Sequence, residues 1–126
     1  MKCLLDTHYL IWVFTNARRL KRFPWLDRYA PWRVSPVSFL EIQLLAESGR
    51  LSVRPTQLIE TVKRDPRFVL DDVVVSVIVH KTLDLSWTRD PFDRMLAAHS
   101  LARQLPFCTT DSDIQANHPL IVPELR

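Results

Sequence analysis

The chain has 126 residues, of which 47% are hydrophobic and 25% charged, a composition typical of a folded protein and not of a disordered one. Its formal net charge of +3 favours contact with polyanions only slightly. A single glycine, Gly49, excludes glycine-rich dinucleotide loops and P-loops, which need several glycines. The two cysteines form no disulfide or zinc motif, and no apolar run approaches the length of a membrane span. We therefore expect one cytoplasmic domain over residues 1–126, with no membrane contact.

The N-terminal third of the chain predicts two short strands separated by a helix and a loop. Cys3-Leu4-Leu5 is an apolar run that suits a buried parallel strand ending at Asp6. Residues 9–14 are rich in large apolar side chains and are expected to form a helix, whereas the basic residues 18–22 are expected in an exposed loop. A second strand is expected around Val34.

Two helices are predicted next. Ser38-Phe39-Leu40-Glu41 matches the Ser-x-x-Glu capping box, which predicts that a helix begins at Ser38. Gly49, a typical residue just after a helix, ends it. Residues 56–64 predict the second helix, which is closed by Pro66.

Residues 73–79 carry conflicting signals. Val-Val-Val-Ser-Val-Ile-Val favours a strand by propensity, whereas Asp71 and Asp72 ahead of it are suited to cap a helix. Propensity alone predicts a strand.

The C-terminal part predicts one long helix and two short strands. Asp90 is suited as the N-cap and Pro91 as the first helical residue, and apolar residues up to Leu105 follow at helical spacing. Residues 107–110 predict a strand that ends at Asp111, and residues 120–122 predict a last one. Strands that alternate with helices indicate an α/β sheet.

Four acidic residues are expected to meet at one edge of this sheet. Asp6 and Asp111 follow predicted strands, and Glu41 and Asp93 lie in the first turns of predicted helices that begin on the same edge. Crowded carboxylates resist ionisation unless a cation neutralises them. Ligation by oxygen alone favours Mg²⁺ or Mn²⁺ over zinc, and the reaction class indicated is hydrolysis of phosphodiester bonds.

Each acid also has a purely structural interpretation. Glu41 needs no metal if it only completes a capping box, and Asp93 needs none if it only interacts with the helix dipole. Asp113 competes with Asp111 as the fourth acid, although it is also suited to cap the short turn that follows. Asp6 is harder to explain structurally, because an aspartate at the end of a buried strand needs a partner.

Four segments, taken in order, resemble the motifs of VapC-type PIN-domain toxins. They are Leu4-Leu5-Asp6-Thr7-His8, Ser35-Pro36-Val37-Ser38-Phe39-Leu40-Glu41-Ile42, Arg89-Asp90-Pro91-Phe92-Asp93-Arg94-Met95-Leu96 and Thr109-Thr110-Asp111. The resemblance implies a PIN-like three-layer α/β/α fold with a small central parallel sheet, and a helix at residues 73–79. It also implies two groups of site residues. The acidic metal-binding positions are Asp6, Glu41, Asp93 and Asp111, and the polar neighbours that would orient them are Thr7, Ser38, Arg94 and Thr110, with Asp113 as a further candidate.

The function that the resemblance implies is that of a Mg²⁺- or Mn²⁺-dependent endoribonuclease, the toxin of a toxin–antitoxin pair. Its expected partners are an RNA substrate, a co-encoded antitoxin and a second copy of the chain. The alternative is a catalytically silent PIN-like module that binds RNA or protein. An aspartyl-phosphate enzyme with Asp6 as nucleophile is disfavoured, because position 8 is a histidine where such phosphatases usually carry a second aspartate.

The segment 18–33 is basic and aromatic, and two interpretations stay open. Its side chains are suited to bind phosphates and stacked bases, or to receive an antitoxin. Alternatively, the aromatic residues belong to the core beside a solvated basic loop.

Overall fold

Four short parallel strands form the centre of the structure, a computed structural model that describes residues 1–126. The strands are β1 (Leu4–Leu5), β2 (Trp32–Val34), β3 (Phe68–Leu70) and β4 (Phe107–Cys108). Their order in the sheet is β3-β2-β1-β4, so β1 lies between β2 and β4. The central position of β1 places the residue that follows it, Asp6, in the middle of the carboxyl edge.

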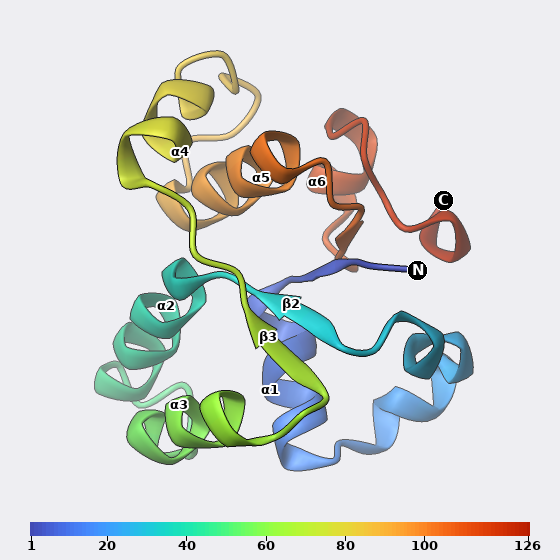
Figure 1. Ribbon diagram of the computed structural model, residues 1–126. Helices are drawn as coiled ribbons and strands as arrows, with labels where there is room; N and C mark the ends of the chain where they lie inside the picture. Colours follow the sequence, from blue (N-terminus) through green and yellow to red (C-terminus); the bar gives the residue numbers. More distant parts are fainter.

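Helices cover both faces of this sheet. They are α1 (Thr7–Thr15), α2 (Pro36–Glu47), α3 (Pro55–Arg64), α4 (Val75–Thr82), α5 (Pro91–Arg103) and α6 (Ser112–Asn117), with three 3₁₀ helices, η1 (Arg18–Arg22), η2 (Pro24–Tyr29) and η3 (Pro123–Leu125). Figure 1 shows α1, α2 and α3 on one side of the strands and α4, α5 and α6 on the other. This is the expected three-layer α/β/α arrangement around a small parallel sheet. No helix is both long and apolar enough to cross a membrane.

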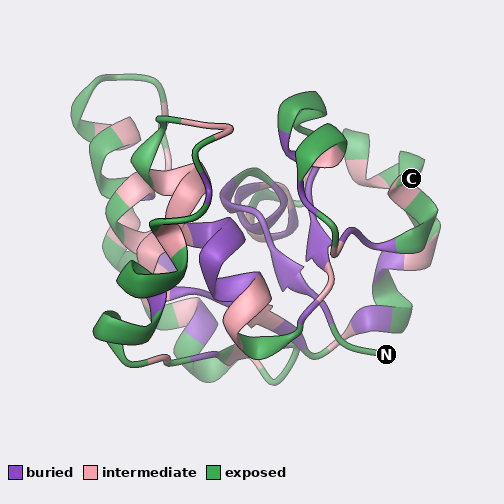
Figure 2. Cartoon of the chain, turned by 90° about the horizontal axis from the view of Figure 1, so that it is seen from above, coloured by how far each residue is buried: buried purple, intermediate pink, exposed green.

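Strands β1 and β4 are buried throughout, and Figure 2 shows buried residues along strands at the centre of the molecule. Leu5 and Cys108 point into the larger core cluster, together with side chains of α1, α2 and α3. Leu4 and Phe107, their neighbours in sequence, point the other way and pack with Leu96 of α5. Successive side chains of β1 and β4 point to opposite faces of the sheet, and each face packs into a core cluster. Both residues of each strand are therefore apolar.

Three elements differ from the sequence-based predictions. Residues 18–22 form the 3₁₀ helix η1 and not an irregular loop. Strand β3 was not predicted, because it has only three residues and follows closely after Pro66. Residues 120–122 form no strand of the sheet and add only an isolated bridge from Ile121 to Phe107.

Helix α2 begins three residues earlier than the capping box predicts. The N-cap is Ser35, whose hydroxyl accepts a hydrogen bond from the Val37 N–H at 3.2 Å, and Pro36 occupies the first turn. Ser38 and Glu41 thus lie inside the helix, and the capping-box interpretation of Glu41 is wrong. The predicted end is right, since Gly49 follows the helix with a φ of 75° that favours glycine.

Residues 75–79 belong to helix α4, as the resemblance implied, whereas Val73 and Val74 precede it. Val74 is the N-cap and no side chain caps the helix, so the prediction that Asp71 or Asp72 caps it is wrong.

The one buried residue of α4, Ile78, packs with Leu85 and with Ala97 and Ala98 of α5. The small alanine side chains let the two helices approach closely. Packing against α5 therefore outweighs the strand propensity of the valines.

Candidate acidic active site

Asp6 lies at the junction of β1 and α1, and both of its carboxylate oxygens are occupied. Oδ1 accepts the Thr7 N–H at 2.7 Å, so Asp6 is the N-cap of α1, and Oδ2 accepts the Thr109 hydroxyl at 2.6 Å. Its side chain is buried. Burial raises the pKa of Asp6, while the Thr109 hydrogen bond and the nearby His8 oppose that rise. The carboxylate is held in one orientation from both sides.

The threonine that contacts the acids is Thr109 and not its neighbour Thr110, which the resemblance implies. Thr109 is fully buried, donates to Asp6 and accepts the Asp111 N–H at 3.1 Å, whereas Thr110 is exposed. The Gln115 side chain also donates to the Thr109 carbonyl at 2.8 Å. The sequence holds one usable signal: the strand is buried on both faces through Cys108, so the threonine nearer to that strand is the one that faces the core.

Asp111 caps α6. Its Oδ1 accepts the N–H groups of Asp113 at 2.9 Å and of Ile114 at 3.0 Å. The prediction that Asp113 caps this turn is therefore wrong, and Asp113 is an exposed residue of the first turn. The other carboxylate oxygen of Asp111, Oδ2, accepts no hydrogen bond. Asp111 lies two residues after Thr109, the residue that donates to Asp6.

Glu41 points from the second turn of α2 toward the same region. Burial raises the pKa of Glu41, the nearby Thr7 hydroxyl opposes the rise, and the charge of Asp6 adds to it. Its Oε1 atom is buried and has no hydrogen-bond partner. Ser38, one turn earlier, accepts the Thr7 hydroxyl at 3.0 Å and so links α2 to α1.

Asp93 lies in the first turn of α5, whose N-cap is Asp90 as predicted. Burial is the largest cause that raises the pKa of Asp93 to about 7, and the charges of neighbouring acids add to it. The contributing neighbours are Asp90, Asp6, Asp111 and Glu41. The four acids singled out in the sequence thus share one electrostatic environment.

Arg94 does not orient these acids. Its guanidinium donates to the carbonyls of Thr82 at 2.8 Å and Thr88 at 3.3 Å. It therefore fixes the connection between α4 and α5, which positions the start of α5 indirectly.

The donor chemistry of the site suits a hard divalent cation, but the side chains do not form a closed set of ligands. No three acidic, histidine or cysteine side chains lie close enough together to hold one ion. The buried, unpartnered Oε1 of Glu41 and the raised pKa of Asp93 are both features that a cation would relieve. A shared ion would require the carboxylates to move closer to one another.

The aromatic residues of the segment 18–33 mostly serve the core. Trp32 is 2% exposed and donates its indole N–H to the Leu26 carbonyl at 2.9 Å. Phe23 stacks on Trp12 with parallel rings, and Arg19 lies over the Trp12 ring at 4.6 Å. The core interpretation is therefore right for Trp32, and the exposed part of this segment is basic.

A parallel sheet in the order β3-β2-β1-β4, covered on both faces and carrying acids at its carboxyl edge, defines a PIN-like α/β protein. The chain matches the PIN domain family over residues 3–118, and it belongs to that family.

Two solved structures share this fold. One is a toxin–antitoxin complex from Klebsiella pneumoniae, with 19% identity, a TM-score of 0.68 and coverage of 96% of each chain. The other is VapBC2 from Rickettsia felis bound to a DNA fragment from its promoter, with 12% identity, a TM-score of 0.66 and coverage of 97% of this chain and 96% of that one. The comparison with curated proteins found no match.

Proposed function

We propose that this chain is a Mg²⁺- or Mn²⁺-dependent endoribonuclease and the toxin of a toxin–antitoxin pair, formed by a single PIN domain over residues 1–126. The observation that carries the proposal is the electrostatic environment shared by Asp6, Glu41, Asp93 and Asp111, in which the pKa of Asp93 rises to about 7. A structural protein gains nothing from such crowding, which costs stability in the absence of a cation.

Each acid has a distinct part in the proposed reaction. Asp6, fixed by Thr7 and Thr109, is the most rigid ligand. Glu41 offers its unpartnered Oε1, Asp93 lies in the first turn of α5, and Asp111 is the N-cap of α6. A bound divalent cation would lower the pKa of a coordinated water and neutralise charge that develops on the phosphate. The basic helix η1 adds exposed positive charge that attracts RNA.

The toxin role is supported by the two structural relatives, both of which are described as toxin–antitoxin assemblies. It is also supported by an exposed apolar stripe on α4. Val75, Val79 and Leu83 lie one turn apart and are 69%, 45% and 67% exposed. Such a stripe is typical of a surface covered by a partner, and we assign it to an antitoxin or to a second copy of the chain.

The alternative function is a catalytically silent PIN module that binds RNA or protein. One observation favours it, because no three potential ligands lie close enough to share an ion. The intact set of four acids favours the nuclease, and cation binding separates the two proposals.

The first experiment measures cleavage of a mixed RNA pool by antitoxin-free protein in Mg²⁺, in Mn²⁺ and in EDTA. We expect cation-dependent cleavage that Asp6→Asn and Asp93→Asn each reduce at least 100-fold, with 5′-phosphate product ends. Asp72→Asn, which changes an exposed acid outside the candidate set, is the matched control and should cleave as the parent does. Folded, partner-free protein that cuts nothing, or variants that cut as well as the parent, would contradict the nuclease proposal and support the silent module.

A further inference from the structure

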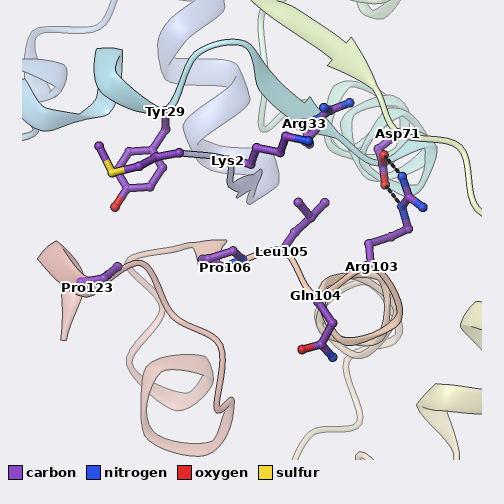
Figure 3. A pocket seen from close by; sticks show the side chains of 10 residues that line it. Lys2, Tyr29, Arg33, Asp71, Arg103, Gln104, Leu105, Pro106 and Pro123 are labelled. Atoms are coloured by element: carbon purple, nitrogen blue, oxygen red, sulfur yellow. Dashed lines mark hydrogen bonds and ion pairs between the residues drawn. The ribbon is translucent and has the colours of Figure 1, made fainter.

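A polar cavity lies away from the four acids. It has a volume of about 510 Å³ and opens between the start of β1, the middle of β2 and the C-terminal end of α5. Asp93 lies in the first turn of α5 and Arg103 in its last, about 15 Å apart along the helix axis. Figure 3 shows Lys2 and Arg33 on the strand side of the cavity, with Arg103 and Leu105 across from them.

The cavity has an excess of positive charge. Lys2, Arg33 and Arg103 line it, and the one carboxylate in its wall is Asp71. Asp71 is already neutralised, because its oxygens accept bonds from the Arg103 guanidinium at 3.0 and 3.2 Å and from His99 at 2.7 Å. Among the side chains that line the cavity, two cations, Lys2 and Arg33, therefore remain without an ion-pair partner.

Arg33 is the residue that most needs a ligand. It projects from a central region of the sheet, its Nε atom is buried without a hydrogen-bond partner, and it forms no ion pair. The residue as a whole is partly exposed, but a buried Nε–H without an acceptor costs free energy that an anion in the cavity would recover. Glu124 follows Pro123 of the lining, and its carboxylate accepts hydrogen bonds from the Tyr29 hydroxyl and from Arg28.

The rest of the cavity suits the organic part of a small molecule. Leu105, Pro106 and Pro123 give it an apolar wall, and its volume falls within the range of small-molecule sites. A phosphate monoester carries about two negative charges at neutral pH, which matches the two cations without an ion-pair partner better than a carboxylate does. The planar fork of Arg33 can donate two parallel hydrogen bonds to phosphate oxygens.

We propose that this cavity binds a small phosphate monoester, with the phosphate on Arg33 and Lys2 and the organic body against Leu105 and Pro106. The site is separate from the acidic one and does not depend on the nuclease proposal. Its occupation ties the start of β1 and the middle of β2 to the end of α5, and so stabilises the folded chain.

The test is isothermal titration calorimetry of the full chain in EDTA, so that no cation links a phosphate to the acids. The probes are adenosine 5′-monophosphate, inorganic phosphate, adenosine and acetate. We expect the monophosphate and inorganic phosphate to bind competitively, and adenosine and acetate to bind at least 10-fold more weakly than the monophosphate. Tighter binding of the monophosphate than of inorganic phosphate would assign the organic body to the apolar wall, and equal binding would assign the site to phosphate alone.

Variants locate the site. Arg33→Met keeps most of the apolar stem of the side chain, and we expect it to weaken phosphate binding at least 10-fold. The affinity of Arg33→Lys should lie between those of the parent and of Arg33→Met. Arg22→Met, an exposed residue of η1, is the matched control and should bind as the parent does, as should Asp6→Asn. If circular dichroism shows Arg33→Met to be unfolded, Lys2→Met carries the test with an expected loss of about 3-fold. Absence of binding to the parent chain, or equal affinities in Arg33→Met or Lys2→Met and in Arg22→Met, would overturn the proposal.

Discussion

The hydroxyl of Thr109 joins two of the acids. It donates to Asp6 and accepts from the Asp111 N–H, so its removal should disturb both positions. We expect Thr109→Val to lower the rate of RNA cleavage about 10- to 100-fold, as is usual when a group that orients a metal ligand is lost. It should also lower the free energy of unfolding by about 1–3 kcal/mol, because a buried acceptor loses its donor.

The matched control for this prediction is Thr110→Val, which changes an exposed hydroxyl next to it. Thr110→Val should leave both the cleavage rate and the stability unchanged. Thr109→Ser keeps the hydroxyl and should therefore retain most of the parent's cleavage activity. Equal effects of Thr109→Val and Thr110→Val, measured side by side, would remove Thr109 from the site.

The buried side chain of His118 is expected to make the folded chain less stable in acid. Its Nε2 lies 2.9 Å from the Ser100 hydroxyl, which itself donates to the Leu105 carbonyl, so Nε2 carries the proton. The other ring nitrogen, Nδ1, is buried without a partner, and burial lowers the pKa of His118 to about 4 from 6.5. The unfolded chain thus takes up a proton between pH 6.5 and 4 that the folded chain refuses. Stability should fall by about 3 kcal/mol across this window.

Urea unfolding at several pH values measures this effect. His118→Phe should have a flatter pH profile than the parent between pH 6.5 and 4, whereas His80→Gln, an exposed control, should keep the parent profile. A profile of His118→Phe as steep as that of the parent would show that another group is responsible.

At this scale the sequence predicts residue types better than contacts. The positions of Asp6 and Asp93 follow from strand and helix ends that short-range patterns indicate. The partner of Asp6, Thr109, lies 103 residues away in the chain and becomes its neighbour only because β4 pairs with β1. Asp111 and Asp113 are both suited to cap α6, and only the backbone geometry separates them.

Helix α4 is the element in which local preference and tertiary packing disagree. Its three valines are exposed to solvent. Their β-branched side chains therefore lower the helix propensity without adding buried apolar contacts. We expect Val75→Ala and Val79→Ala each to raise the free energy of unfolding by about 0.5 kcal/mol, because alanine favours a helix at exposed positions. The same substitutions in a strand would lower it.

Denaturant unfolding of antitoxin-free protein, with the double variant included, measures this difference. Ile78→Ala is the contrasting variant, since Ile78 is the buried contact to α5, and it should cost about 2–4 kcal/mol. Destabilisation by Val75→Ala and Val79→Ala would contradict an exposed helical α4.

Long periodic elements were the easiest to predict. Helix α5 has its N-cap, its proline and its apolar spacing in one continuous stretch, and the structure confirms the N-cap Asp90 and the proline at the first position. The predicted apolar face extended to Leu105, whereas the helix ends at Arg103 and Leu105 follows its C-cap. Strand β3 could not be predicted in this way, because Phe68–Leu70 is too short to show alternation. It exists because it pairs with β2, a contact that no local pattern records.

At the scale of the whole molecule, the acids that we propose to bind a cation lower the stability of the fold when no cation is bound. Asp93 lies near other carboxylates, which disfavours its charged form in the folded chain. Asp93→Asn should therefore raise the free energy of unfolding in EDTA at about pH 7. We expect a gain of about 1–2 kcal/mol, because solvent screens a partly exposed group. The parent chain should instead gain stability from Mn²⁺, by about 2.7 kcal/mol at 100 times the dissociation constant. Asp93→Asn should lose most of that gain.

Thermal unfolding with EDTA, Mg²⁺ or Mn²⁺ tests this exchange without any RNA. Asp72→Asn, which changes an exposed acid far from the site in sequence, should respond to Mn²⁺ as the parent does. A parent chain that gains nothing from either cation would speak for the silent module.

Asp6, Asp90 and Asp111 each cap a helix with a side-chain oxygen. Asparagine caps a helix about as well as aspartate, so the backbone of this chain would survive a change from aspartate to asparagine at position 6 or 111. A lineage in which nuclease activity became harmful could therefore lose it by one substitution and keep the fold and its binding surfaces. The capping role of these aspartates is thus separable from the catalytic role proposed for them, because asparagine can fill the first and not the second.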